Sequence, residues 1–152
     1  MRRKEKEVTS TEWMEDVLLK AQICRIGLIG TKYPYIVPVN YGYTEGKLYF
    51  HSACEGQKLE MLAQNPNVCV QVDIETVIEE TDIPCNWSTK YKSVIAYGKA
   101  EIINEPLEKE NALSIIVRHY KKDFKDGYPF RDMDKVCIVR ISFDSMTGKQ
   151  SG

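Results

Sequence analysis

The chain has 152 residues, of which 28% are charged, and its formal net charge is -1. This length suits one domain with a substantial core, so we expect a single domain over residues 1–152. A nearly neutral chain offers no electrostatic attraction for nucleic acid or a membrane surface, and we expect neither as a partner. The charged start Met1–Glu7 leads into no apolar run, and no run approaches the length of a bilayer span. We therefore expect neither a signal peptide nor a transmembrane helix.

The cysteines argue against a covalent framework. Their number is odd, no pair has C-x-x-C spacing, and three lie inside apolar strand patterns. We expect reduced thiols in a cytoplasmic protein, and neither a disulfide framework nor a zinc site. With two histidines in the chain, a histidine-rich metal site is excluded by supply. The cysteines are Cys24, Cys54, Cys69, Cys85 and Cys137.

The first third of the chain predicts a helix followed by two strands. Thr9 and Glu12 form a capping-box pair, which predicts a helix ending near Gln22 that covers one end of a sheet. Cys24–Ile29 alternates as a first strand, and Pro34–Tyr43 is predicted as a second.

Pro38 lies in the middle of the predicted second strand. Proline cannot donate to a ladder, so the strand is an edge there, bulged, or facing a ligand. The glycine turn Thr44–Lys47 predicts a hairpin that pairs the P-V-N run (Pro38–Asn40) antiparallel to the F-H-S run that follows. That pairing would set Asn40 near His51.

The stretch Lys47–Leu62 reads as a strand in which Leu48 and Phe50 alternate with Tyr49 and His51, followed by a turn and a helix. It carries the strongest sequence signal for a binding site. A helix that starts after small residues leaves backbone N–H groups unpaired and open to an anion. Ser52, Gln57 and Lys58 add a hydroxyl, an amide and a cation beside them. We interpret the stretch as a phosphate pocket; the alternative is that Ser52 is an ordinary N-cap.

The rest of the chain adds three strands and a helix. In all, six strands joined mostly by hairpins, with helices between some of them, predict a mainly β, α+β fold: a six-stranded antiparallel barrel with flanking helices. The remaining predicted elements are a strand at Val68–Asp73, a solvated connection at Ile74–Trp87, a strand at Lys90–Ile103 bulged at Gly98, a helix from Pro106, a loop at Asp123–Asp134 and a strand at Val136–Asp144.

Four stretches together resemble the FMN-binding split-barrel superfamily. They are V-P-V-N (Val37–Asn40), F-H-S-A-x-x-G-x-K (Phe50–Lys58), C-N-W-S-x-x-Y-x-S-V (Cys85–Val94) and M-T-G-K-Q-S-G (Met146–Gly152). Within the superfamily they look most like pyridoxamine 5′-phosphate oxidase-like proteins of the nitroimidazole-resistance type. The resemblance covers nearly the whole chain in the same order. It implies a split barrel and a homodimer with FMN bound at the subunit interface.

The resemblance also implies which residues hold the cofactor. In that family, the strand matching V-P-V-N lies along the flavin ring, and the segment matching H-S-A, with the helix after it, borders the flavin and holds its phosphate. The W-S-x-x-Y region lies near the cofactor, partly from the other chain. The implied cofactor-binding residues are Pro38, Val39, Asn40, His51, Ser52, Ala53, Gln57, Lys58, Trp87, Ser88 and Tyr91.

Some of these residues have simpler explanations. His51 is the implied catalytic residue, a flavin neighbour that can donate a proton to substrate; a lone strand histidine is otherwise usually a hydrogen-bonded structural imidazole. Trp87 is either a cofactor neighbour or a packing aromatic. Cys54 and Cys85 are either reactive thiols or, more commonly, small buried side chains. His119 is expected to be solvated.

The resemblance implies a flavin-dependent reductase that passes reducing equivalents from a nicotinamide donor to a small aromatic or nitro compound. No Rossmann fingerprint is present, so a nicotinamide would visit the flavin transiently. The alternatives are a haem- or flavin-binding carrier or sensor without turnover, with His51 as an axial haem ligand, and a dimer with an empty pocket. The tail Gly148–Gly152 lacks the arginine that true pyridoxamine phosphate oxidases use for the substrate phosphate, and Arg140 is the last arginine, so we do not expect that reaction.

Overall fold

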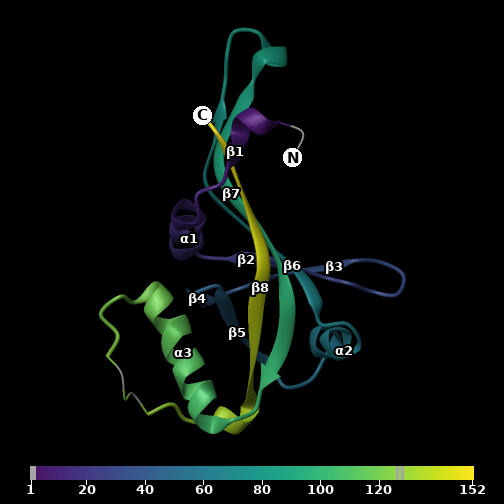
Figure 1. The fold of residues 1–152 in the computed structure, drawn as a ribbon, viewed down its shortest axis with the longest axis vertical. Helices are drawn as coiled ribbons and strands as arrows, with labels where there is room; N and C mark the ends of the chain where they lie inside the picture. The colour runs from purple at the N-terminus through teal and green to yellow at the C-terminus, as the bar shows by residue number, and fades with distance from the viewer. Residues whose placement is uncertain (1–2, 126, 128) are drawn as a thin grey trace.

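The computed structural model describes residues 3–125, 127 and 129–152. Met1 and Arg2 of the charged start, and Asp126 and Tyr128 of the predicted loop, lie outside the described residues. The chain forms an antiparallel eight-stranded sheet with three α-helices packed on it (Figure 1). Along the sheet the strands run in the order β3-β2-β6-β7-β8-β5-β4, with β1 paired to β8.

The predicted mainly β class with flanking helices is confirmed, with eight strands in place of six. One extra strand is β1, and the other arises because the predicted second strand is divided in two. The strands are β1 (Glu7–Val8), β2 (Cys24–Leu28), β3 (Tyr35–Val39), β4 (Gly42–Thr44), β5 (Lys47–Ala53), β6 (Asn67–Glu79), β7 (Ser88–Ile103) and β8 (Val136–Ser151). The helices are α1 (Thr11–Lys20), α2 (Gln57–Gln64) and α3 (Pro106–Tyr120), with 3-10 turns at Lys4–Lys6, Pro84–Asn86 and Met133–Lys135.

Helix α1 begins one residue later than its predicted capping box. Its N-cap is Ser10, whose hydroxyl accepts a hydrogen bond from the Trp13 N–H at 3.2 Å. The Thr9 capping box is therefore wrong, because a neighbouring hydroxyl takes the same role. Helix α3 begins at Pro106 as predicted, and the Glu105 carboxylate caps its first turn.

The predicted second strand is broken between β3 and β4. Strand β3 pairs with β2 and ends the sheet, which confirms that Pro38 sits on an edge strand. At Tyr41 the chain turns into the core, where the phenol donates a hydrogen bond to the Leu18 carbonyl at 2.5 Å. The predicted pairing of Pro38–Asn40 with the F-H-S run is therefore wrong: of the two strands, β4 pairs with β5 and β3 does not.

The last three long strands extend further than their patterns predicted. Strand β6 continues through part of the predicted connection to Glu79, and β7 begins at Ser88, so that a β6–β7 hairpin projects from the sheet (Figure 1). Strand β8 includes the tail to Ser151 and pairs with β7 along this length. The predicted bulge at Gly98 is confirmed; the extra residue is Asp144 on β8, and a side chain at Gly98 would collide with the backbone of β8.

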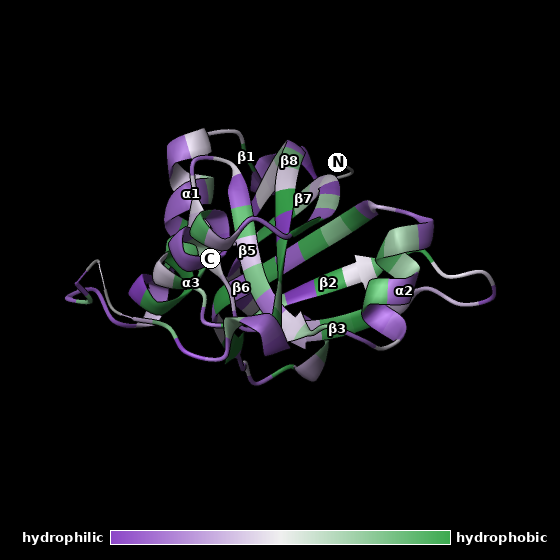
Figure 2. Ribbon diagram, turned by 90° about the horizontal axis from the view of Figure 1, so that it is seen from below, coloured by the Kyte–Doolittle hydropathy of each residue, from purple (hydrophilic) through white to green (hydrophobic). Residues whose placement is uncertain are grey.

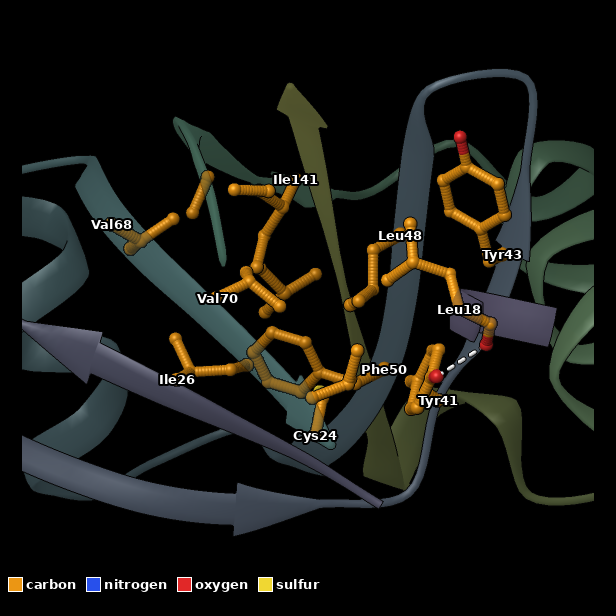
Figure 3. Packing of buried hydrophobic residues seen from close by; sticks show 14 of the residues in the cluster. Leu18, Cys24, Ile26, Tyr41, Tyr43, Leu48, Phe50, Val68, Val70 and Ile141 are labelled. Atoms are coloured by element: carbon orange, nitrogen blue, oxygen red, sulfur yellow. Dashed lines mark hydrogen bonds between the residues drawn. The ribbon is translucent and has the colours of Figure 1, made fainter. Parts of the chain in front are cut away.

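Two apolar clusters hold the sheet and helices together. The first lies inside the curl of the sheet and includes Leu18, Leu48 and Phe50 (Figure 3). The second packs α3 onto the other face of β5, where Tyr49 meets Ile116. The predicted alternation along β5 is thus confirmed, and Figure 2 shows apolar and polar residues alternating along the strands. In the described part of the chain, no helix is long and apolar enough to cross a membrane.

Candidate functional site

Five of the predicted cofactor-binding residues lie together where β5 passes into α2. His51, Ser52 and Ala53 end β5, and Gln57 and Lys58 begin α2. We call the segment from His51 to Lys58 the β5–α2 corner. Its side chains form an open surface: His51, Ala53 and Gln57 are exposed, and Ser52 and Lys58 are half-buried.

The start of α2 has the properties of an anion site. Its N-cap is Gly56, at a φ of 113° that favours glycine, and glycine has no side chain to cap the helix. The N–H groups of Gln57 and Lys58 therefore have no acceptor within the helix, and they carry the positive end of the helix dipole. Ser52 lies in β5 and not at the helix start, so the alternative of an ordinary N-cap is wrong.

Lys58 adds a cation beside these N–H groups. Its Nζ lies 5.2 Å from the centre of the Phe50 ring, over the edge of the first core cluster. Partial burial lowers the pKa of this ammonium. A half-buried cation held against an aromatic ring is stabilised when an anion binds next to it.

The three residues predicted on the V-P-V-N strand lie at the sheet edge. Pro38 is exposed, and Val39 is packed against the first core cluster. The Asn40 amide donates a hydrogen bond to the Tyr120 hydroxyl at 3.3 Å. Continued by two residues, the β4–β5 register would set Asn40 opposite His51, but the described ladder ends at Gly42.

The three predicted residues of the W-S-x-x-Y region lie on the β6–β7 hairpin. Trp87 is 48% exposed, and its indole N–H donates to the Thr81 carbonyl at 2.9 Å within the hairpin. Ser88 begins β7, and the Tyr91 ring lies 5.7 Å from Lys149 Nζ. In Figure 1 this hairpin points away from β5 and α2. One chain therefore does not bring Trp87 to the β5–α2 corner.

A disulfide at the β5–α2 corner corrects the expectation of reduced thiols. Cys54 and Cys137 are bonded, with their Cα atoms 4.9 Å apart. They are separated by 83 positions in sequence, and the pairing of β5 with β8 brings them together. Sequence spacing carries no signal for such a pair. Cys24, Cys69 and Cys85 are free.

His119 is a polar residue whose role the sequence pattern missed. It was expected to be solvated, but its Nε2 lies 2.7 Å from the Ala21 carbonyl oxygen and its ring packs 4.5 Å from the Tyr41 ring. Its Nδ1 is buried and has no hydrogen-bond partner among the described residues. Burial lowers the pKa of this imidazole, which favours the neutral form with the proton on Nε2. The neighbouring Tyr120 hydroxyl donates a hydrogen bond to the Gln22 carbonyl and accepts one from the Tyr41 N–H.

An apolar groove of about 560 Å³ lies on the outer face of β2, β3, β6 and β7. Ile29, Ile36 and Tyr97 line it and are more than half exposed. Arg25 borders it and pairs with Asp73 at 3.1 Å. Contiguous exposed apolar surface of this kind is typical of an interaction face.

With the fold and these surfaces defined, comparison with known proteins identifies the family. The family model described as pyridoxamine 5′-phosphate oxidase matches residues 10–150. The chain belongs to the pyridoxamine 5′-phosphate oxidase family. The predicted resemblance to pyridoxamine 5′-phosphate oxidase-like proteins is thereby confirmed.

Similar structures and sequences are also found. A crystal structure of a candidate 5-nitroimidazole antibiotic resistance protein from Bacteroides thetaiotaomicron is 35% identical, covers 94% of this chain and 85% of that one, and has a TM-score of 0.82. A FAD-binding protein from Mesorhizobium loti is 25% identical over 94% of this chain and 96% of its own, with a TM-score of 0.68. A curated, uncharacterized protein of Rhizobium meliloti is 32% identical over 65 residues, which span 43% of this chain and 42% of that protein.

The last arginine of the chain is paired with acidic side chains. The Arg140 guanidinium pairs with Glu101 and lies 3.7 Å from Glu108. These carboxylates hold the last arginine of the chain within the sheet. Arg140 is thus engaged by acidic groups of its own chain.

Proposed function

We propose that this protein binds a flavin, with FMN as the leading candidate, and that the flavin phosphate lies at the β5–α2 corner. The observation that carries the proposal is the open start of α2, where two N–H groups have no acceptor within the helix and Lys58 adds a half-buried cation, a few residues after Ser52. These groups fit a phosphate: backbone donors, a hydroxyl and a fixed positive charge. The family membership and the FAD-binding relative from Mesorhizobium loti support a flavin as its carrier.

We further propose that the site is completed in a homodimer. An isoalloxazine ring needs an apolar slot, whereas His51 and Ala53 lie on an open surface of one chain. A second copy would supply the missing wall, and the projecting β6–β7 hairpin with Trp87 is suited to reach across to it. The exposed groove around Ile36 and Tyr97 offers apolar area for the contact between copies.

The proposed activity is reduction of a small aromatic or nitro compound, with a nicotinamide as electron donor. The nitroimidazole-resistance candidate supports this substrate class. Bound flavin supplies the electron transfer, and the protein orients the substrate and limits access of water. The exposed His51 imidazole would hold and donate the proton that the reduced substrate takes up.

The test of flavin binding is an absorbance spectrum of the purified protein, repeated after FMN is added and the sample desalted. We expect a retained flavin spectrum with one FMN per chain. Lys58→Ala is expected to weaken FMN affinity about tenfold, the equivalent of one charge-assisted hydrogen bond. The matched control is Lys20→Ala, because Lys20 is an exposed helix lysine that pairs with Asp16 on α1.

The same spectrum separates the alternatives. A Soret band in place of the flavin spectrum would favour the haem-binding carrier or sensor. If neither chromophore is retained, the flavin proposal is wrong. A retained flavin that does not catalyse oxidation of NADH by nitro compounds would contradict the reductase activity while leaving flavin binding intact.

A further inference from the structure

The disulfide lies at the part of the β5–α2 corner that positions the proposed phosphate site. Cys137 stands opposite Ser52 in the β5–β8 ladder, and the last ladder pair is Ala53 with Val136. Cys54 follows directly, outside the ladder. The cross-link therefore holds the chain to β8 one residue beyond the point at which the β5 hydrogen bonds end.

This position matters for the groups that follow. From Cys54 the chain passes through Gly56 to Gln57, whose N–H is the first of the unpaired donors of α2. The bends at 54–56 have no ladder partner of their own, and Gly56 adopts a φ that few other residues reach. Without the cross-link, this short segment has more conformations available, and the α2 donors are less well fixed relative to Ser52.

The cross-link is accessible to solvent thiols. Cys54 is exposed and Cys137 is half-buried. The free Cys24, in contrast, is fully buried in the first core cluster, and burial raises the pKa of its thiol to about 12. Accessible disulfides are the ones that exchange with thiols in solution.

We propose that Cys54–Cys137 is a reversible thiol–disulfide site that sets the affinity of the β5–α2 corner for a flavin phosphate. The bonded form holds the α2 donors in place and binds FMN tightly, and the reduced form binds it weakly. The inference rests on the proposed flavin binding and adds its regulation. Cys54 acts as a positioning residue: it does not contact the phosphate, but it fixes the turn that positions the α2 donors.

The exchange requires a dithiol as reductant. One thiolate of the dithiol attacks Cys54 Sγ, the Sγ–Sγ bond breaks, and the Cys137 thiolate leaves and takes up a proton. The second thiol of the reductant then attacks the mixed disulfide. The reductant departs as a cyclic disulfide, and Cys54 is left as a thiol. Two electrons pass from the dithiol to the protein, and an oxidant of the disulfide class reverses the step.

The experiment measures FMN and riboflavin affinity of the full-length protein, by quenching of flavin fluorescence, before and after treatment with dithiothreitol. We expect reduction to weaken FMN binding about tenfold, and reoxidation to restore it. Riboflavin lacks the phosphate, so its affinity should stay the same in both states. A general loosening of the structure would weaken both ligands alike, which would overturn the inference.

Variants and thiol counting sharpen the result. Cys54→Ser/Cys137→Ser should show the weak FMN affinity with or without dithiothreitol, whereas Cys85→Ser, which removes an exposed free thiol, should keep the switch. If the double variant does not fold, the reversible change in the natural protein still decides the matter. Equal FMN affinity in both states, with thiol titration showing that the pair has opened, would overturn this inference alone. FMN binding in neither state would overturn the proposed flavin binding as well.

Discussion

Two corners of this molecule treat their polar groups in different ways. At the β5–α2 corner, the N–H groups that open α2 have no acceptor within the helix, and Ser52 and Lys58 of the same segment are half-buried. At the end of α3, the Tyr120 hydroxyl donates to the Gln22 carbonyl at 2.6 Å and accepts from the Tyr41 N–H at 3.0 Å. At the second corner these groups are paired within the chain, although the buried Nδ1 of His119 has no partner among the described residues.

This difference indicates which polar groups stabilise the fold and which are available for binding. Polar groups that find partners within the chain contribute to folding, and groups left open are available to a ligand. His119 and His51 illustrate the same point, because one imidazole is packed against Tyr41 and bonded to Ala21, while the other is exposed. Changes at the α3 end should therefore affect stability, and changes at the β5–α2 corner should affect flavin affinity.

The largest effect is expected at Tyr41. This side chain is fully buried, so Tyr41→Ala leaves a cavity and should lower the free energy of unfolding by about 3–5 kcal/mol. Urea denaturation measures the change. Tyr33→Ala is the matched control, since Tyr33 is 70% exposed, and the expected change there is within about 0.5 kcal/mol. A Tyr41→Ala protein of natural stability would contradict the structural role of this corner.

A smaller effect is expected when one hydroxyl is removed. Tyr120→Phe leaves the Gln22 carbonyl and the Tyr41 N–H without their partner, and should lower the free energy of unfolding by about 1–2 kcal/mol. Tyr33→Phe, at a side chain that is 70% exposed, is the comparison. Equal unfolding midpoints for the two variants would show that these hydrogen bonds do not stabilise the fold.

The contrast between the corners also explains what could be predicted from sequence. The alternation along β5 and the helix start after it depend on neighbours in sequence, so the strand, the turn and α2 were found. The break between β3 and β4 depends on Tyr41 reaching Leu18, a contact between distant segments. Alternation of apolar and polar residues in the sequence does not reveal the position at which the strand is interrupted and a side chain turns into the core.

Long-range pairing accounts for the other differences. The tail Met146–Ser151 has weak strand character by composition, and it is a strand because β7 and β1 pair with it. Cys54 and Cys137 meet because β5 and β8 are neighbours in the sheet. The polar network of His119 likewise joins α3 to the residues after α1. Each of these features follows from the topology, which short-range spacing does not specify.

Titration of His119 offers a finer test of the structural corner. Burial lowers its pKa in the folded protein, so between the folded and unfolded pKa values the unfolded chain binds more protons. The stability that the neutral imidazole contributes is present above the unfolded pKa of about 6.5. It is lost as the pH falls through that value toward the folded pKa.

The measurement is the free energy of unfolding as a function of pH. The natural protein should lose stability as the pH falls from about 7 to 5, and His119→Gln should flatten part of this slope. His51→Gln is the matched control because it leaves the contacts of His119 with Ala21 and Tyr41 in place. A slope unchanged by His119→Gln would mean that other groups carry the acid sensitivity.

The smallest effect on stability is expected at Ser52, and it is the sharpest test of the comparison. The Tyr41 and Tyr120 hydroxyls donate hydrogen bonds to the carbonyls of Leu18 and Gln22, whereas no such bond is formed by the Ser52 hydroxyl among the described residues. Ser52→Ala should therefore change the free energy of unfolding by less than about 0.5 kcal/mol. Its FMN affinity should nevertheless fall about tenfold, as expected for a lost hydrogen bond to phosphate. Urea denaturation and FMN titration of the same sample measure both. A large loss of stability without loss of affinity would reverse the assignment, because the hydroxyl would then belong to the fold and not to the ligand.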